Sequence, residues 1–234
     1  MSSLEGKWAL VTGASRGIGK QIALGLSELK ANLILHARKT EHLLPVADIL
    51  KNKGSKVHLV CGELSNSVEL EAMLDQVLSI SDRIDILYNN AAIMTPSTEP
   101  FSASSDDYRR TFEVNTIAVI RICNRIIPGM LERGYGRVIN VTSGIKDQPN
   151  LMPYAVSKAA LDKYVHDLIP TVSNTGVFVN LLDPGWLRTD LGGSNAPDSV
   201  ESVLPGALMP ALLEIETQGK LFCAQDYRML TLKV

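Results

Sequence analysis

The sequence predicts an α/β fold in which parallel strands alternate with helices. Two observations indicate it. Short apolar runs without polar alternation, typical of strands buried on both faces, alternate along the chain with longer stretches whose apolar residues recur at helical spacing. The chain has 234 residues, and no linker or internal repeat divides it. Because α/β sheets often reach this size undivided, we expect a single domain over residues 1–234.

The strands are predicted from the short apolar runs, each of which lies between turn residues. They cover residues 8–11, 31–37, 56–61, 84–88, 137–142, 177–182 and 221–224. The helices are predicted from apolar residues at helical spacing. They cover 18–29, 41–53, 70–78, 106–133, 154–169 and 199–214. Pro45 lies near the start of the second helix, Ser65 or Asn66 caps the third, and Pro205 and Pro210 kink or split the last.

The bulk composition favours a small-molecule partner. The net charge is -2 and charged residues make up 21% of the chain, with no basic block, so nothing favours nucleic acid or an anionic membrane. No apolar run approaches the roughly 20 residues that cross a bilayer, and residues 1–7 carry no apolar signal core. We therefore expect a cytoplasmic protein without a membrane segment.

The cysteines and the other metal-ligating residue types predict no metal site. The three cysteines, Cys61, Cys123 and Cys223, lie far apart in apolar segments. This pattern is more typical of core thiols than of a disulfide, a metal site or a nucleophile. No cluster of His, Cys and carboxylate residues has the spacing of metal ligands.

The turn after the first strand is rich in glycine, and reads Thr12-Gly13-Ala14-Ser15-Arg16-Gly17-Ile18-Gly19. Glycines let a backbone adopt positive φ and approach a phosphate closely, and the free amides of the following helix attract negative charge. The turn therefore favours binding of a dinucleotide pyrophosphate. Its Gly-x-x-x-Gly-x-Gly spacing is one residue wider than the general fingerprint, so a turn that only packs a strand against a helix is the alternative.

Cations follow the second strand, at Arg38 and Lys39. In a dinucleotide fold the end of this strand reaches the adenosine ribose, where an acidic residue would bind the 2′-hydroxyl and repel a 2′-phosphate. Arg16 adds a third cation to the same region. NADP(H) is therefore favoured over NAD(H), and solvated surface charge is the alternative. Glu63 follows the third strand, where its carboxylate either accepts from the adenine amino group or caps the next turn.

Tyr154 and Lys158 are four residues apart, so they lie one turn from each other on one helix face. A phenol with a pKa near 10 is a poor acid or base at neutral pH, and a neighbouring ammonium lowers that pKa. Ser143 follows the fifth strand. Asn115 lies among apolar residues of the long helix, where a buried amide must be hydrogen-bonded; a satisfied core asparagine is the alternative to a functional one.

Taken in order, these motifs resemble the short-chain dehydrogenase/reductase family. The matching residues are Thr12-Gly13-x-x-x-Gly17-x-Gly19, Asn89-Asn90-Ala91, Asn115, Ser143, Tyr154 with Lys158, and Pro184-Gly185. The resemblance implies a single-domain Rossmann-type fold: a doubly wound parallel sheet of about seven strands in the order 3-2-1-4-5-6-7, with helices on both faces. It also implies an NADP(H)-preferring carbonyl reductase or ketoreductase.

The resemblance implies a role for each matching residue. Tyr154 is the general acid that protonates the carbonyl oxygen, Lys158 lowers its pKa and binds the nicotinamide ribose, and Ser143 binds the substrate oxygen. Asn115 holds a water that links Lys158 to solvent. The residues expected to bind the cofactor are Gly13, Ser15, Arg16, Gly17, Ile18, Gly19, Arg38, Glu63, Leu64, Asn90, Ala91, Tyr154, Lys158, Pro184, Gly185 and Thr189.

The chain departs from the family pattern in four places. Glu63 stands where Asp is usual, and Ala92 where Gly is usual. The loop 144–153 is shorter than common, and the stretch 189–199 is too short for a helical lid. We therefore expect an open substrate pocket.

These observations favour an oxidoreductase that transfers a hydride between NADP(H) and a ketone or aldehyde. One alternative is a catalytically inactive NADP(H)-binding sensor or scaffold, and a second is an epimerase or dehydratase. By resemblance, helices 106–133 and 154–169 pair in a homodimer or homotetramer. Substrate identity and stereochemistry, reaction direction and the strictness of the cofactor preference are not determined by the sequence.

Overall fold

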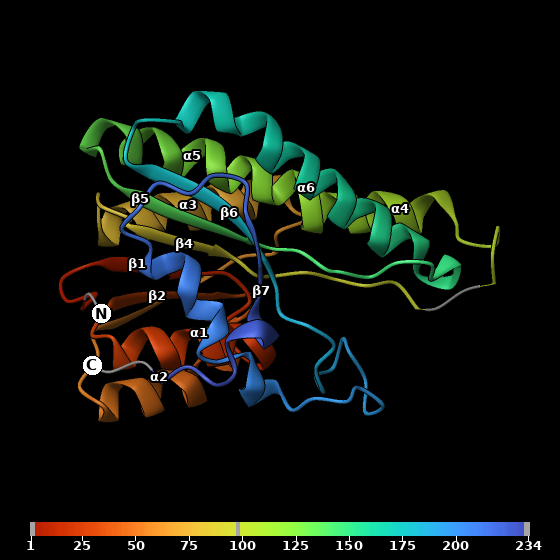
Figure 1. Ribbon diagram of the computed structural model, residues 1–234, viewed down its shortest axis with the longest axis horizontal. Coiled ribbons are helices and arrows are strands. Elements are labelled where there is room, and N and C mark those ends of the chain that lie inside the picture. The colour runs from red at the N-terminus through yellow and green to blue at the C-terminus, as the bar shows by residue number, and fades with distance from the viewer. Residues whose placement is uncertain (1–2, 97–98, 232–234) are drawn as a thin grey trace.

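The computed structural model describes residues 3–96 and 99–231. Its centre is a seven-stranded parallel sheet in the order β3-β2-β1-β4-β5-β6-β7, which confirms the predicted topology (Figure 1). The strands are β1 Trp8–Val11, β2 Asn32–Ala37, β3 Val57–Cys61, β4 Ile86–Asn89, β5 Gly136–Val141, β6 Val177–Asp183 and β7 Leu221–Cys223. The chain changes direction across the sheet between β1 and β4, and ligands of open α/β sheets bind beyond the carboxyl ends of the strands at such a point.

Helices cover both faces of the sheet, as predicted (Figure 1). One face packs against α1 Gly17–Glu28 and α2 Leu44–Asn52, and the other against α3 Ser67–Ile80, α5 Ala118–Arg133 and α6 Met152–Val172. Neighbouring strand residues face opposite cores: Val11 belongs to the first and Leu10 to the second. This is why the strands read as continuous apolar runs rather than as alternating ones.

The predicted helix 106–133 is a continuous helix with one irregular turn. It consists of α4 Ser105–Phe112, a π-helical turn η2 Glu113–Ile117, and α5. Ser104 starts it with a capping box to Asp107. By length and composition alone this helix could cross a membrane, with a mean hydropathy of 1.2, which differs from the expectation that no run does so. In its most apolar 18-residue stretch, 56% of this helix is buried inside the fold, so a core helix explains its composition equally well.

Two other helices differ from their predicted bounds. The stretch 199–214 forms no α-helix but two short 3-10 segments, η4 Val200–Val203 and η5 Gly206–Leu212, because Pro205 separates them and Pro210 lacks the N–H that a continuous helix needs. The second helix begins at Leu44, after a 3-10 turn η1 Thr40–His42, and places Pro45 in its first turn, where a missing N–H costs nothing. The remaining 3-10 segments are η3 Pro149–Leu151 and η6 Ala224–Tyr227.

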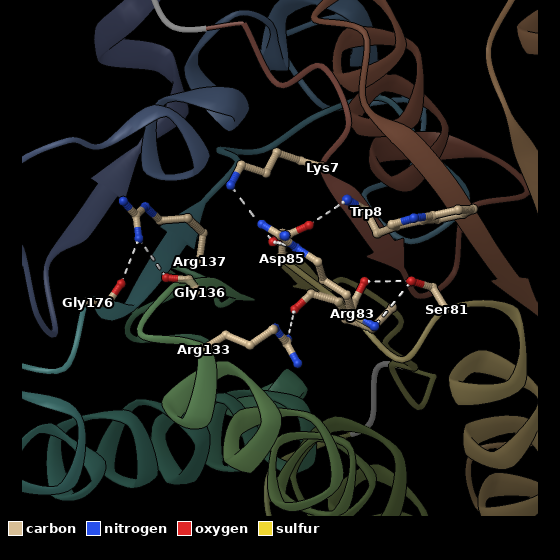
Figure 2. A network of polar contacts seen from close by, with 10 residues as sticks. Lys7, Trp8, Ser81, Arg83, Asp85, Arg133, Gly136, Arg137 and Gly176 are labelled. Carbon is tan, nitrogen blue, oxygen red and sulfur yellow. Dashed lines mark hydrogen bonds and ion pairs between the residues drawn. The ribbon is translucent and has the colours of Figure 1, made fainter.

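A buried polar network connects neighbouring strands at their amino ends (Figure 2). The Asp85 carboxylate, which is fully buried, accepts from Trp8 N–H at 2.9 Å and from Arg83 Nε at 2.8 Å. Arg137 is 6% exposed, and its guanidinium donates to the carbonyl oxygens of Gly136, Gly176 and Leu213. These contacts connect the amino ends of β1, β4, β5 and β6, whereas the glycine turn lies at the carboxyl ends of the strands.

All three cysteines are free. Cys123 is fully buried, as predicted for a core thiol, whereas Cys61 and Cys223 are only partly buried, because they lie at the ends of β3 and β7. Within the described residues no group of three or more His, Cys, Asp or Glu side chains could hold a metal ion.

Candidate active site

The glycine turn packs so tightly against the loop after β4 that side chains would not fit. Gly13 has φ +65°, and a Cβ there would lie 2.9 Å from Ala91 Cα. A Cβ on Gly19 would overlap the carbonyl oxygen of Gly13. The following helix α1 has no side-chain cap and no acidic residue in its first turn. The N–H groups of that turn are therefore open to an anion, as pyrophosphate binding requires.

Hydrogen bonds of Thr12 and Asn90 connect this turn to the loop after β4. Thr12 Oγ1 accepts from the N–H groups of Asn90 and Ala91, at 2.9 and 3.0 Å, and donates to the Tyr88 carbonyl. Asn90 Nδ2 donates to the carbonyls of Thr12 at 2.8 Å and Gly13 at 3.2 Å. Thr12 therefore connects the glycine turn to the loop after β4. The sequence analysis included Thr12 only as part of the glycine motif and predicted no contact for its side chain.

His36 is a second support that the sequence did not reveal. It lies at the end of β2, is almost fully buried, and accepts from Gly13 N–H through Nδ1 at 3.4 Å. Its Nε2 lies 2.9 Å from the Gly62 carbonyl, so the proton of the neutral ring is assigned to Nε2. Burial lowers the pKa of His36, which favours this neutral form.

The predicted phosphate-binding cations lie on the surface beside the turn. Arg38 is exposed just after β2. Arg16 is also exposed, and its Nε forms an ion pair with Asp190 Oδ2 at 2.9 Å. Glu63 accepts from the N–H of Ser65 at 3.3 Å, so its carboxylate caps the local turn, and Leu64 lies in the core.

Ser143, Tyr154 and Lys158 come together at the carboxyl end of β5. The Ser143 side chain lies close enough to the Tyr154 hydroxyl to lower the pKa of that phenol, and its Oγ accepts from Ile145 N–H at 3.3 Å. Lys158 is 3% exposed, its Nζ donates to the Val141 carbonyl at 2.6 Å, and it lies 5.9 Å from the centre of the Tyr154 ring. The structure therefore brings these three predicted site residues together.

The pKa values of this group are dominated by burial. Burial lowers the pKa of Lys158 to about 8, against an ordinary 10.5, and the Asp162 charge opposes that shift. Burial raises the pKa of Tyr154, the nearby Ser143 side chain lowers it, and the Asp183 charge raises it further. The predicted lowering of the Tyr154 pKa by Lys158 is therefore not found in this structure: the pKa is raised, because burial is the largest effect and Lys158 is not among the groups that shift it.

Asn115 lies in the π-helical turn η2 and is completely buried. Its Nδ2 donates to the Ile93 carbonyl at 2.9 Å and to Ser157 Oγ at 3.0 Å, and its Oδ1 accepts from Ile93 N–H at 2.9 Å. Ser157 Oγ in turn donates to the Tyr154 carbonyl at 2.7 Å. Asn115 is thus a satisfied core asparagine that also links the loop after β4 to α6. Since both amide donors are used, a bound water would have to donate to an oxygen of Asn115.

The model of the short chain dehydrogenase family matches residues 7–199. The chain belongs to the short-chain dehydrogenase family. It is 34% identical over 191 residues to the 3-oxoacyl-[acyl-carrier-protein] reductase FabG of Vibrio cholerae, spanning 81% of this chain and 77% of that relative. It is 33% identical over 221 residues to nodulation protein G of a Rhizobium species, spanning 92% and 88%.

Solved structures of short-chain dehydrogenases share the fold over nearly the whole chain. A metagenomic short-chain oxidoreductase solved in complex with NADP superimposes with a TM-score of 0.81 and 28% sequence identity, covering 95% of this chain and 99% of that one. The seven-stranded order and the flanking helices are therefore those of the family.

The segment after β6 lies beside the glycine turn of this short-chain dehydrogenase. Asp183 Oδ1 accepts from Gly185 N–H at 2.9 Å, and Gln225 Nε2 donates to the Pro184 carbonyl at 2.7 Å. Thr189 Cγ2 lies 3.6 Å from the position of a Cβ on Gly17, so this segment reaches the glycine turn. No helix forms between residues 189 and 199, as the short stretch predicted. Trp186 is 60% exposed there and donates to the Gly192 carbonyl rather than lining a closed pocket.

Proposed function

We propose that this short-chain dehydrogenase is an NADP(H)-dependent oxidoreductase that reduces a ketone or aldehyde, and in reverse oxidises the alcohol. The observation that carries the proposal is the grouping of Ser143, Tyr154 and the buried Lys158 ammonium at the carboxyl end of β5. These side chains lie at the carboxyl ends of the strands, as does the glycine turn, where the N–H groups of the first turn of α1 have no side-chain cap. A binding-only sensor has no use for such a proton donor, so the sensor alternative is less favoured.

The residues around the glycine turn fit NADP(H). The space cleared at Gly13 and Gly19 and the uncapped first turn of α1 suit a pyrophosphate. Arg16 and Arg38 would bind the 2′-phosphate, a preference that the NADP complex of the metagenomic relative supports. The other residues proposed to hold the cofactor are Ser15, Gly17, Ile18, Glu63, Leu64, Asn90, Ala91, Pro184, Gly185 and Thr189. When bound, NADPH supplies the hydride.

The chain itself positions the substrate and transfers the proton. The Ser143 side chain lies near the Tyr154 hydroxyl, so both would donate to one carbonyl oxygen placed between them. Tyr154 then gives its proton to that oxygen as negative charge develops. Lys158 holds a positive charge beside the phenol and stabilises the phenolate that remains. We assign Asn115 to proton resupply, through a water held at one of its oxygens.

The assembly and location of the protein are further parts of the proposal. Apolar side chains on the outer helix surfaces are exposed, namely Ile117 at 40% on η2 and Val156 at 42% on α6. These surfaces support a homodimer or homotetramer formed through α5 and α6. A cytoplasmic location, an open substrate pocket and a carbonyl substrate of modest size remain predictions.

The test is oxidation of NADPH, and separately of NADH, with a panel of ketones, aldehydes and diones. We expect turnover with NADPH that Tyr154→Phe reduces at least about 100-fold, because general acid catalysis contributes on that scale. The matched control is Tyr135→Phe, which removes a hydroxyl at the opposite edge of the sheet. NADPH binding without carbonyl reduction, unchanged by Tyr154→Phe, would favour the sensor. Faster turnover with NADH would refute the assignment of Arg16 and Arg38.

A further inference from the structure

Helix α6 carries a row of titratable side chains that extends beyond the proposed catalytic pair. Tyr154, Lys158, Asp162 and His166 recur every four residues, so they lie on one face of the helix. The first two have roles in the proposed function. Asp162, one turn beyond Lys158, has none so far, although it is half-buried.

Asp162 and Lys158 are anchored to consecutive residues of the same strand end. Lys158 Nζ donates to the Val141 carbonyl at 2.6 Å, and Thr142 Oγ1 donates to Asp162 Oδ1 at 2.5 Å. The Thr142 hydroxyl therefore holds the Asp162 carboxylate at the carboxyl end of β5, where the Lys158 ammonium is also bound. No ion pair joins Lys158 to any carboxylate among the described residues, so Asp162 acts on the ammonium through its charge and not through direct contact.

Burial makes such a counter-ion necessary. An ammonium that is 3% exposed has lost most of its hydration, and among the described residues the Lys158 ammonium donates to a single carbonyl, that of Val141, as compensation. Among the described groups Asp162 supplies the charge that opposes the effect of burial on Lys158. The charged groups that act on Asp162 itself are Lys158 and His166 on α6 and Asp183 at the end of β6. Asp183 is occupied with Gly185 N–H, and His166 is exposed.

We propose that Asp162 is a positioning residue for catalysis: its carboxylate, held by Thr142, is the counter-ion that keeps Lys158 in its ammonium form beside Tyr154. The inference rests on the proposed function, in which that ammonium stabilises the phenolate. It extends the site by one helical turn, and it gives the hydroxyl of Thr142, the residue before Ser143, a role of its own.

The primary test is a direct titration of Lys158 in the wild type and in Asp162→Asn. Protein labelled with 13C at the lysine Cε is followed by NMR, and the Lys158 signal is assigned by its absence in Lys158→Arg. Removing a negative charge makes proton loss easier, so the pKa of Lys158 should fall by about one unit in Asp162→Asn. Thr142→Val, which removes only the anchor, should lower the pKa by less, and Asp162→Glu should restore it. The control Asp167→Asn changes an exposed carboxylate on the same helix and should leave the titration unchanged.

The same variants are then compared in the pH profile of kcat/KM for carbonyl reduction. Loss of a proton from Tyr154 or Lys158 ends activity at high pH, and removing the Asp162 charge favours both losses. The falling limb should therefore move to lower pH in Asp162→Asn. An unshifted Lys158 titration, or a uniform loss of activity with an unmoved limb, would overturn the inference. A shifted titration in a protein that reduces no carbonyl would instead uphold the charge pairing and refute the proposed function.

Discussion

Removing the carboxylate of Asp190 should strengthen NADPH binding selectively. Arg16 is proposed to bind the 2′-phosphate, yet in the structure its Nε is paired with Asp190 Oδ2 at 2.9 Å. A 2′-phosphate must therefore compete with this carboxylate for the guanidinium. Asp190→Asn removes the competitor and leaves the rest of the segment after β6 in place.

The size of the effect follows from the exposure of the pair. The side chains of Arg16 and Asp190 are 65% and 74% exposed, and ion pairs so exposed to water contribute roughly 0.2 to 1 kcal/mol. Released to the phosphate, that energy corresponds to a Kd for NADPH about 1.4 to 5 times lower, since 1.4 kcal/mol is tenfold. NADH lacks the 2′-phosphate, so its Kd should not change. Because salt screens exposed charges, the gain should shrink at high ionic strength.

The assay is titration of nicotinamide fluorescence with NADPH and with NADH at low and high salt. The control Asp198→Asn breaks another ion pair of the same segment, with Arg228, and should leave the ratio of the two affinities unchanged. Weaker NADPH binding in Asp190→Asn would refute the reasoning, because the pair would then support the bound state. An equal gain for NADH would also refute it, since the 2′-phosphate would play no part.

Two further predictions concern stability. Arg137→Met should lower the free energy of unfolding by about 2–4 kcal/mol in urea denaturation, because it removes the hydrogen bonds that the buried guanidinium donates to the carbonyls of Gly136, Gly176 and Leu213. The exposed Arg109→Met should cost under about 0.5 kcal/mol. Equal costs would contradict the structural role of this network. Burial lowers the pKa of Lys158 to about 8, so between that pH and 10.5 the unfolded chain binds more protons than the native one. The stability of the wild type relative to Lys158→Met should therefore rise with pH over this range, by up to about 1.4 kcal/mol per unit, and a flat or falling difference would contradict the burial of the ammonium.

The sequence predicted the sheet and most helices because their signals are local. Strands buried on both faces read as apolar runs, and helices on one face read as apolar residues at helical spacing, whatever lies opposite them. Where local signals compete, the prediction was less exact. The stretch 199–214 kept a helical pattern of apolar residues, but Pro205 and Pro210 exclude a continuous backbone ladder. The π-helical turn around Asn115 left no local mark at all.

The candidate site shows the same division. The sequence by itself selected the side chains that we propose to carry the chemistry, because the glycine turn, Ser143 and the Tyr154–Lys158 pair are recognised by residue type and short spacing. Only the tertiary structure decided what those side chains experience. The pairing of Arg16 with Asp190, the burial that shifts the pKa values of Tyr154 and Lys158, and the placement of Asp162 on Thr142 all join segments far apart in the chain. Burial and charge contact depend on how the elements pack, and no local pattern of residues encodes them.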